Sequence, residues 1–181
     1  MQHIESAWHD AAASAIVSQA MSSPNEEFYA AAFWLCYVDY TLFGTPCFAM
    51  NTESHCAVSV AEWGEGVRWS PPNWQYDVID QAVQTMIPCY QSLSDSLAGQ
   101  SEAVWDEAIE EHWRLLARVC IRLTHEARHR EGYFSDVVLP ASFVVGILEE
   151  REGEPIFSQL VRSSIVPDIL STLPSPIWEP R

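Results

Sequence analysis

The chain has 181 residues, of which 48% are hydrophobic and 12% aromatic, and this composition excludes an intrinsically disordered protein. Its formal net charge of −16 arises from 25 acidic residues against nine arginines and no lysine, which disfavours nucleic acid and anionic membranes as partners. Because this length fits one domain, we expect residues 1–181 to form a single domain with a proline-rich C-terminal tail from about residue 167.

The predicted elements begin and end with a helix. In chain order they cover residues 3–21 (helix), 28–38 and 46–50 (strands), 53–61, 76–97 and 101–130 (helices), 137–148 (strand) and 154–164 (helix). Apolar residues at helical spacing predict the helices, and runs of aromatic and β-branched residues predict the strands. Pro24 ends the first helix, Asn51 or Thr52 caps the second, and Pro155 opens the last.

The segment 101–130 gives the strongest helical pattern, because its apolar residues recur on one face. We therefore expect an α+β fold. A small, mostly antiparallel β-sheet formed by 28–38, 46–50 and 137–148 should pack against four or five helices. The long helix near 101–130 should be the principal packing element.

Charge is distributed unevenly along the chain. The first 111 residues contain 16 carboxylates and one basic residue, Arg68, whereas five arginines lie between Arg114 and Arg130. In the predicted long helix, charged residues recur at every fourth position: Glu110, Arg114, Arg118, Arg122, Glu126 and Arg130. This pattern fits a solvated face, or a basic face that docks onto the protein's own carboxylates or onto a partner. We expect the acidic excess to bind a basic partner, although a passive acidic surface has the same composition.

An acidic, tryptophan-rich segment is the predicted contact surface. Trp63, Trp69 and Trp74 lie in or beside an irregular stretch broken by glycines and prolines, where they are either core anchors or interface hot spots. Together with neighbouring carboxylates they give the predicted partner-binding residues: Glu62, Trp63, Glu65, Trp69, Trp74, Asp77 and Asp80.

One motif is similar to a catalytic site. His125–Glu126–Ala127–Arg128–His129 fits the HExxH pattern, in which two histidines one helical turn apart bind zinc and the glutamate activates a water. No histidine follows His129, so a third ligand such as Asp136 or Glu149 has to be assumed, and the flanking arginines add positive charge. A zinc hydrolase therefore remains an alternative, and we predict no catalytic residue, metal or cofactor.

The remaining signals indicate a cytoplasmic protein. The five cysteines form no CxxC pair, which disfavours a disulfide framework and a thiolate zinc site. Residues 1–8 lack the features of a secretory signal, and the longest apolar run, Phe28–Val38, is too short to cross a bilayer. The sequence has no glycine-rich phosphate loop and no GxSxG motif.

Several short blocks resemble one bacterial family. In chain order they are Asn25–Ala30, Asn51–Glu53, Arg68–Pro71, Asn73–Tyr76, Asp136–Leu139 and Pro167. Over roughly residues 3–175 the chain is thereby similar to the domain of unknown function numbered 4303. This resemblance implies an α+β fold and a role beside polymorphic toxins as a small acidic immunity protein, and it supplies no catalytic residues.

We therefore expect a non-enzymatic immunity protein that binds and neutralises a cognate bacterial toxin, either polymorphic or delivered by contact. A toxin with a basic cleft, such as a nuclease, suits an acidic inhibitor because opposite potentials speed association. A zinc hydrolase based on His125, Glu126 and His129 is one alternative, and an acidic DNA mimic that inhibits host nucleases is another. We expect no nucleic acid and no membrane as partner, and the oligomeric state stays open.

Overall fold

The computed structural model of the protein describes residues 2–36, 38–153 and 155–173. In these residues six α-helices and three strands occur in the order α1 (Gln2–Ser22), β1 (Phe28–Trp34), β2 (Cys47–Thr52), α2 (Glu53–Trp63), α3 (Asp80–Leu97), α4 (Glu102–His129), β3 (Val144–Ile147), α5 (Ile156–Ser164) and α6 (Pro167–Leu170). Short 3₁₀ turns connect them: η1 (Glu65–Trp69), η2 (Pro71–Asn73), η3 (Gly132–Phe134) and η4 (Glu150–Glu152). The predicted α+β class and the predicted long helix are confirmed.

The strands form one mixed sheet in the order β2–β1–β3. β1 and β2 run antiparallel, with Ala31 opposite Met50, whereas β1 and β3 run parallel, with Ala31 opposite Val145. The sheet is thus mixed where the sequence predicted a mostly antiparallel one. The reason is that the chain reaches β3 only after α2, α3 and α4, and this long crossover returns it in the direction of β1.

The strands 28–38 and 137–148 were predicted to be longer than they are. β1 stops at Trp34 because Leu35 has a left-handed backbone (φ 55°), which does not fit an extended strand. β3 is confined to Val144–Ile147. Parts of the predicted first strand, last helix and tail (residues 37, 154 and 174–181) lie outside the described residues, and Pro167 begins α6.

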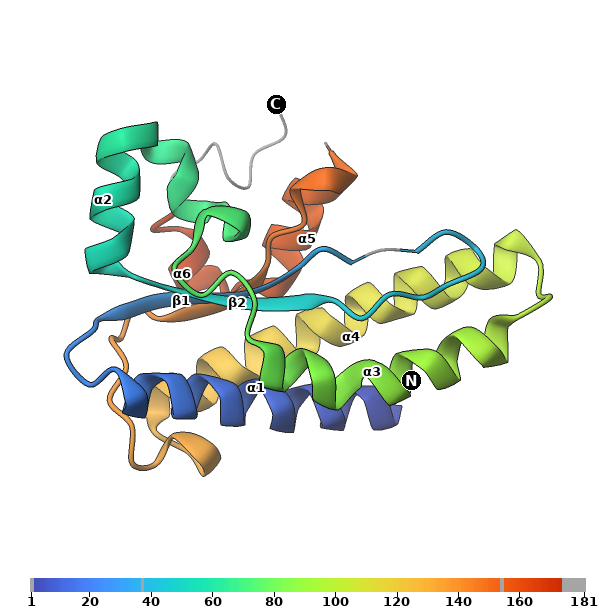
Figure 1. Ribbon diagram of the computed structural model, residues 1–181, viewed down its shortest axis with the longest axis horizontal. Coiled ribbons are helices and arrows are strands. Elements are labelled where there is room, and N and C mark those ends of the chain that lie inside the picture. Colours follow the sequence, from blue (N-terminus) through green and yellow to red (C-terminus); the bar gives the residue numbers. More distant parts are fainter. Residues whose placement is uncertain (1, 37, 154, 174–181) are drawn as a thin grey trace.

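Helices cover both faces of the sheet (Figure 1). α1, α3 and α4 lie against one face, where Phe28, Phe33 and Phe48 join their apolar residues in one buried cluster. α2, α5 and α6 lie on the opposite side, where Ala30 and Ala32 belong to a second cluster. β1 is therefore buried on both faces, as its unbroken run of aromatic and apolar residues predicts.

Each outer edge of the sheet is closed by the chain itself. Along β3, the Val145 N–H donates to the Thr124 hydroxyl and the Ile147 N–H to the Ser164 hydroxyl, both at 2.9 Å. Along β2, the segment that leads into α3 contributes three backbone hydrogen bonds of 2.7–3.2 Å. Exposed strand edges promote aggregation, and buried N–H groups without a partner cost free energy, so these contacts stabilise a small sheet.

A chain of polar groups crosses the core between α1, α3 and α4. The Trp8 indole N–H donates to the Tyr90 hydroxyl (2.8 Å), and this hydroxyl donates to Nε2 of His112. Burial lowers the pKa of His112 to about 3, so the ring stays neutral and its Nε2 can accept. The three side chains satisfy one another where water does not reach them.

Replacing Thr124 by valine keeps the shape of the side chain and removes the hydroxyl that serves β3. Because the Val145 N–H then loses its partner in the interior, we expect Thr124→Val to lower the free energy of unfolding by about 1–3 kcal/mol. Thr85→Val is the matched control, since the Thr85 hydroxyl lies on the exposed side of α3. Urea unfolding measures both variants, and equal effects would contradict the role given to Thr124.

His112 makes stability depend on pH. The pKa of this ring is ordinarily 6.5 and about 3 in the folded protein, so the unfolded chain binds an extra proton as the pH falls between these values. Between them, the free energy of unfolding should fall by up to about 1.4 kcal/mol per pH unit. We expect His112→Gln to remove this contribution and the exposed substitution His3→Gln to keep it. Urea unfolding over this pH range tests the assignment, which an unchanged slope in His112→Gln would refute.

Candidate functional site

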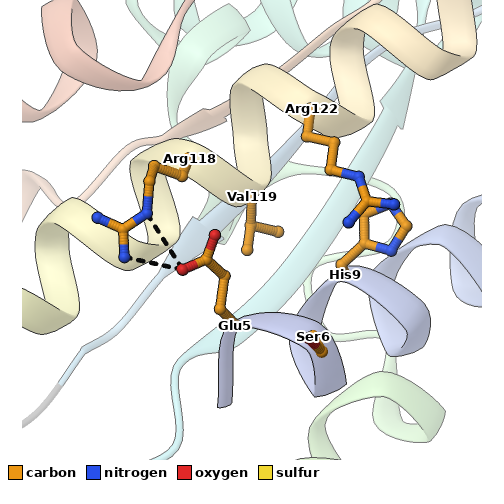
Figure 2. A pocket seen from close by; sticks show the side chains of 6 residues that line it. All are labelled: Glu5, Ser6, His9, Arg118, Val119 and Arg122. Carbon is orange, nitrogen blue, oxygen red and sulfur yellow. Dashed lines mark hydrogen bonds and ion pairs between the residues drawn. The ribbon is translucent and has the colours of Figure 1, made fainter. Parts of the chain in front are cut away.

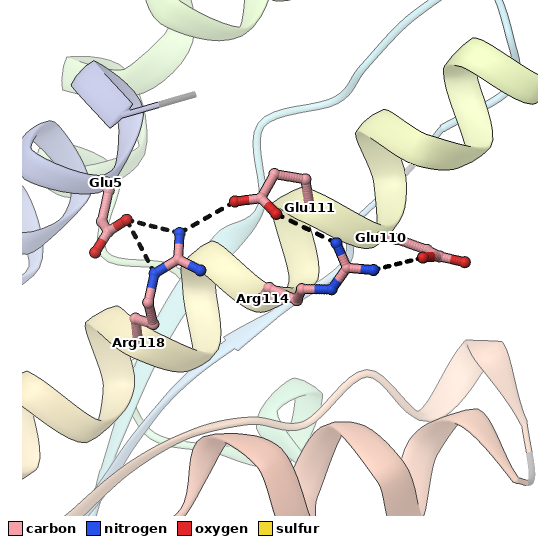
Figure 3. A network of polar contacts seen from close by, with 5 residues as sticks. All are labelled: Glu5, Glu110, Glu111, Arg114 and Arg118. Atoms are coloured by element: carbon pink, nitrogen blue, oxygen red, sulfur yellow. Dashed lines mark hydrogen bonds and ion pairs between the residues drawn. The ribbon is translucent and has the colours of Figure 1, made fainter.

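The arginines are mostly engaged in ion pairs within the chain. Among the described residues the ion pairs include Arg68 with Glu53, Arg114 with Glu110 and Glu111, Arg118 with Glu5 and Glu111, Arg122 with Glu126, Arg128 with Asp168, and Arg151 with Glu149. Figure 3 shows the continuous part of this network, in which Arg118 of α4 reaches Glu5 of α1. The charged face of α4 is therefore solvated at Arg114 and Arg122, which pair within the helix, and docked onto another element at Arg118, so both alternatives that its spacing left open hold in part.

These ion pairs matter more for the surface potential than for stability. Arg118 and Glu5 are 2.8 Å apart with side chains 48% and 33% exposed, and a pair in such a position stabilises by about 0–1 kcal/mol. Their main consequence is that much of the positive charge on the surface is already neutralised. The negative charge of exposed carboxylates elsewhere on the protein is therefore not offset by these arginines.

A small pocket lies between α1 and α4 (Figure 2). It has a volume of about 150 Å³ and is lined by Glu5, Ser6, His9, Arg118, Val119 and Arg122. Arg118 bonds Glu5 through two nitrogens, while Arg122 and His9 both bond Glu126, at 2.8 and 2.9 Å. Because carboxylates already engage Arg118, Arg122 and His9, we interpret the pocket as part of the seam between α1 and α4 and not as an anion site.

Local signals set the position of α2. The Thr52 hydroxyl caps the helix by accepting from the His55 N–H (3.3 Å), and Glu53 lies in the first turn, where a negative charge is favourable. Gly64 ends the helix with a positive φ of 85°. Cys56 is the residue of this helix that is buried in the interior. The helix is therefore held mainly by its ends.

Two apolar residues of α2, Val58 and Trp63, are widely exposed on different sides of the helix, with Trp63 at its C-terminal end. Val58 is 66% and Trp63 is 69% exposed, and the carboxylates Glu62 and Glu65 beside them are exposed as well. Within the described residues, neither carboxylate forms an ion pair. We call Val58, Glu62, Trp63 and Glu65 the α2 surface. An exposed tryptophan among apolar and acidic side chains offers a contact surface for another molecule.

Trp69 and Trp74 were predicted as partner-binding residues with the core as the alternative, and both are buried core anchors. They are 9% and 4% exposed and pack edge-on against Tyr29, with ring centroids 5.6 and 6.0 Å away. The Trp74 indole N–H donates to the Arg68 carbonyl (3.0 Å), and the Arg68 guanidinium lies 4.4 Å from the centre of the Tyr29 ring. These two tryptophans anchor η1 and η2 to the sheet, and of the three predicted tryptophans Trp63 is the exposed one.

The four predicted carboxylates do not lie on one element. Glu62 and Glu65 lie at the junction of α2 and η1, whereas Asp77 and Asp80 lie at the start of α3, beside the outer edge of β2. Burial raises the pKa of the Cys47 thiol, and Asp77 and Asp80 raise it further. All four carboxylates are exposed, as expected of contact residues. They lie at two separate places, Glu62 with Glu65 and Asp77 with Asp80.

The HExxH segment is built differently from a hydrolase centre. His125 and His129 stack on each other, with ring centroids 4.1 Å apart. Partial burial raises the pKa of Glu126, but hydrogen bonds from His9 and Arg122 outweigh this effect and the net shift is downward. Glu126 is thus engaged in the seam with α1. Among residues 2–36, 38–153 and 155–173, no three His, Cys, Asp or Glu side chains are grouped so that they could hold a metal ion.

A buried polar cluster that the sequence did not indicate surrounds Asn51. Its side-chain amide donates to the Tyr29 hydroxyl (3.1 Å), and its carbonyl accepts from the Gln75 N–H and from the His55 ring, both at 3.1 Å. Asn51 therefore ties β1, the start of α2 and the segment after η2 together. The signal for it was an asparagine at the end of a strand that is otherwise apolar.

Comparisons with known proteins do not assign the chain to a family. The chain matches no family model, no curated protein and no solved structure. Within the part of the chain that the structure describes, none of the helices combines the length and hydrophobicity needed to cross a bilayer.

Trp63 and Trp74 form a matched pair, since the same substitution acts in two environments. We expect Trp74→Ala to lower the free energy of unfolding by about 3–5 kcal/mol, because it leaves a cavity beside Tyr29. Trp63→Ala should change it by no more than about 0.5 kcal/mol, because the ring is exposed. Urea unfolding of both variants tests the assignment, which comparable losses in the two would contradict.

Proposed function

We propose that the protein is an immunity protein that neutralises a cognate bacterial toxin by binding it through the α2 surface, with no chemistry of its own. The exposure of Trp63 and Val58 beside uncompensated carboxylates carries the proposal. The resemblance to the domain of unknown function numbered 4303 agrees with it. A toxin that acts inside the cell is met in the cytoplasm, and the proposal places the protein there.

The charge around α2 selects a basic partner. Arg68, the one basic residue in the first 111, is ion-paired with Glu53 and so does not offset Glu62 or Glu65. The whole chain adds a net charge of −16 at pH 7. A field of this sign repels nucleic acid and attracts cationic proteins over distances of about a Debye length, roughly 8–10 Å at physiological salt.

Trp63 would supply binding energy through apolar contact, which long-range charge attraction alone does not provide. A few buried aromatic side chains usually carry most of the affinity of an interface, while the charged rim mainly sets the rate of association. On α2 the exposed residues Ala57 and Ala61 are small and leave a partner free access to Val58, whereas Trp63 is open at the C-terminal end of the helix. The α2 surface thus combines an apolar anchor with an acidic rim.

A nuclease toxin fits this surface best, since a cleft that holds phosphates must be basic. An acidic protein that covers such a cleft competes with nucleic acid by carrying charge of the same sign. Inhibition then requires a one-to-one complex and no catalytic residue, in keeping with the absence of transferable catalytic residues from the family resemblance.

Affinity capture from the source cells tests the proposal. The tagged protein should retain one basic protein in a one-to-one complex whose association slows as salt is added. Trp63→Ala should weaken that complex by about 2 kcal/mol or more, roughly 30-fold in Kd, without loss of folding. Capture of many host nucleases and no single partner would instead favour the acidic DNA mimic.

A charge-matched pair of variants tests the location of the site. Glu62→Arg with Glu65→Arg should slow association markedly, whereas Asp95→Arg with Glu107→Arg should have a smaller effect. Asp95 and Glu107 are exposed at the end of α3 and the start of α4, on the far side of the molecule from α2 (Figure 1). Surface plasmon resonance gives the two rates, and equal slowing by both pairs would mean that α2 is not the contact.

A further inference from the structure

The function proposed above does not use the C-terminal end of α4, where two histidines lie one turn apart. The rings of His125 and His129 are stacked, with centroids 4.1 Å apart and an angle of 25° between their planes. Both side chains are exposed, His125 to 59%. Two imidazoles in this arrangement present their outer nitrogens to the same region of solvent.

Hydrogen bonding orients these nitrogens. Nδ1 of His129 lies 2.8 Å from the backbone carbonyl oxygen of His125. A carbonyl oxygen can only accept, so Nδ1 carries the hydrogen and the lone pair of the neutral ring is on Nε2. The Glu131 carboxylate lies 3.8 Å from Nδ1 of His125 and favours the hydrogen on that nitrogen as well. Metal-binding histidines are commonly oriented by such a carbonyl or carboxylate on the other nitrogen.

The local charge does not oppose a cation as strongly as the sequence indicates. Arg128, which lies between the two histidines, is ion-paired with Asp168 at 2.7 Å. Arg122, one turn before His125, is ion-paired with Glu126 at 2.8 Å. Arg130 remains, and Glu131 follows it directly with the opposite charge. The chain as a whole has a net charge of −16 and raises the local concentration of cations.

We propose that His125 and His129 chelate one divalent transition cation of the zinc class through their Nε2 atoms, with water in the remaining positions. Zinc–nitrogen bonds of 2.0–2.1 Å and tetrahedral geometry set two ligand nitrogens about 3.3 Å apart. The rings, now stacked with 25° between their planes, have to rotate so that both Nε2 lone pairs point at the same cation, and their exposure on the surface of α4 leaves room for this. Imidazole nitrogen is a good ligand for zinc, nickel and copper and a poor one for magnesium and calcium.

The site binds a cation without hydrolytic activity. In an HExxH hydrolase the glutamate is the general base for a metal-bound water. Here Glu126 is 13% exposed and bonds His9 and Arg122, so its carboxylate belongs to the seam with α1 and does not reach a water on the histidines. The two histidines of the motif thus provide the chelate, whereas Glu126 is held in the seam between α1 and α4.

Isothermal titration with ZnCl₂, in the presence of excess Mg²⁺ to occupy scattered carboxylates, tests the inference. The wild-type protein should bind one zinc per chain. His125→Gln and His129→Gln should each weaken this binding at least 10-fold, and Glu131→Gln by up to about 10-fold. His3→Gln is the matched control and should bind as the wild type does. The zinc-loaded protein should not cleave casein.

The outcomes separate this site from the function proposed above. Absence of saturable zinc binding, or binding that survives both His125→Gln and His129→Gln, would overturn the metal site. Cleavage of casein by the zinc-loaded protein, lost in Glu126→Gln, would overturn its non-catalytic character. The histidine and Glu131 substitutions are at exposed positions, and circular dichroism confirms that the variants fold. None of these results affects binding through the α2 surface.

Discussion

The central strand β1 is buried on both faces and hydrogen-bonded on both edges, and most of the architecture follows from that. A strand in this position needs a helical layer on each side and a strand at each edge. Large aromatic residues on one face of the sheet meet the long helices α1, α3 and α4. Alanines on the other face leave room for the rings of Trp69 and Trp74, which anchor the short turns between α2 and α3. α2 is held at the margin of this second layer, and its outward side stays exposed.

The second constraint is electrostatic. A chain with 25 acidic and nine basic residues can neutralise little of its own charge, and two of its arginines, Arg118 and Arg128, join α4 to α1 and to α6. Glu5 and Glu53 are paired with Arg118 and Arg68, whereas Glu62 and Glu65 form no ion pair among the described residues and stay uncompensated at the surface. The seam between α1 and α4 and the acidic α2 surface are therefore two consequences of the same distribution of charge. In this seam Glu126 bonds His9 of α1 and is therefore not engaged with His125 and His129, its neighbours in sequence.

Local patterns were enough to predict the elements but not their pairing. The apolar periodicity of α4 and the apolar run of β1 are strong local signals: α4 was predicted to within one residue at each end, and β1 was predicted with its correct start but four residues too long. The parallel direction of β3 depends on a crossover of three helices, which no local pattern records. Trp63 and Trp74 are both tryptophans of one acidic segment, yet the first is exposed and the second is buried. Trp74 is buried because its indole reaches the Arg68 carbonyl, a contact that exists only after η1 and η2 have folded.

The most direct test of binding through α2 is hydrogen exchange measured on the protein alone and in complex with the captured partner. The account predicts new protection concentrated in residues 53–65, which form α2 and the start of η1, with little change in α4. Protection confined to the end of α3 and the start of α4, or spread evenly over the acidic surface, would contradict it. In that case the exposed tryptophan of α2 would be an incidental feature of the fold.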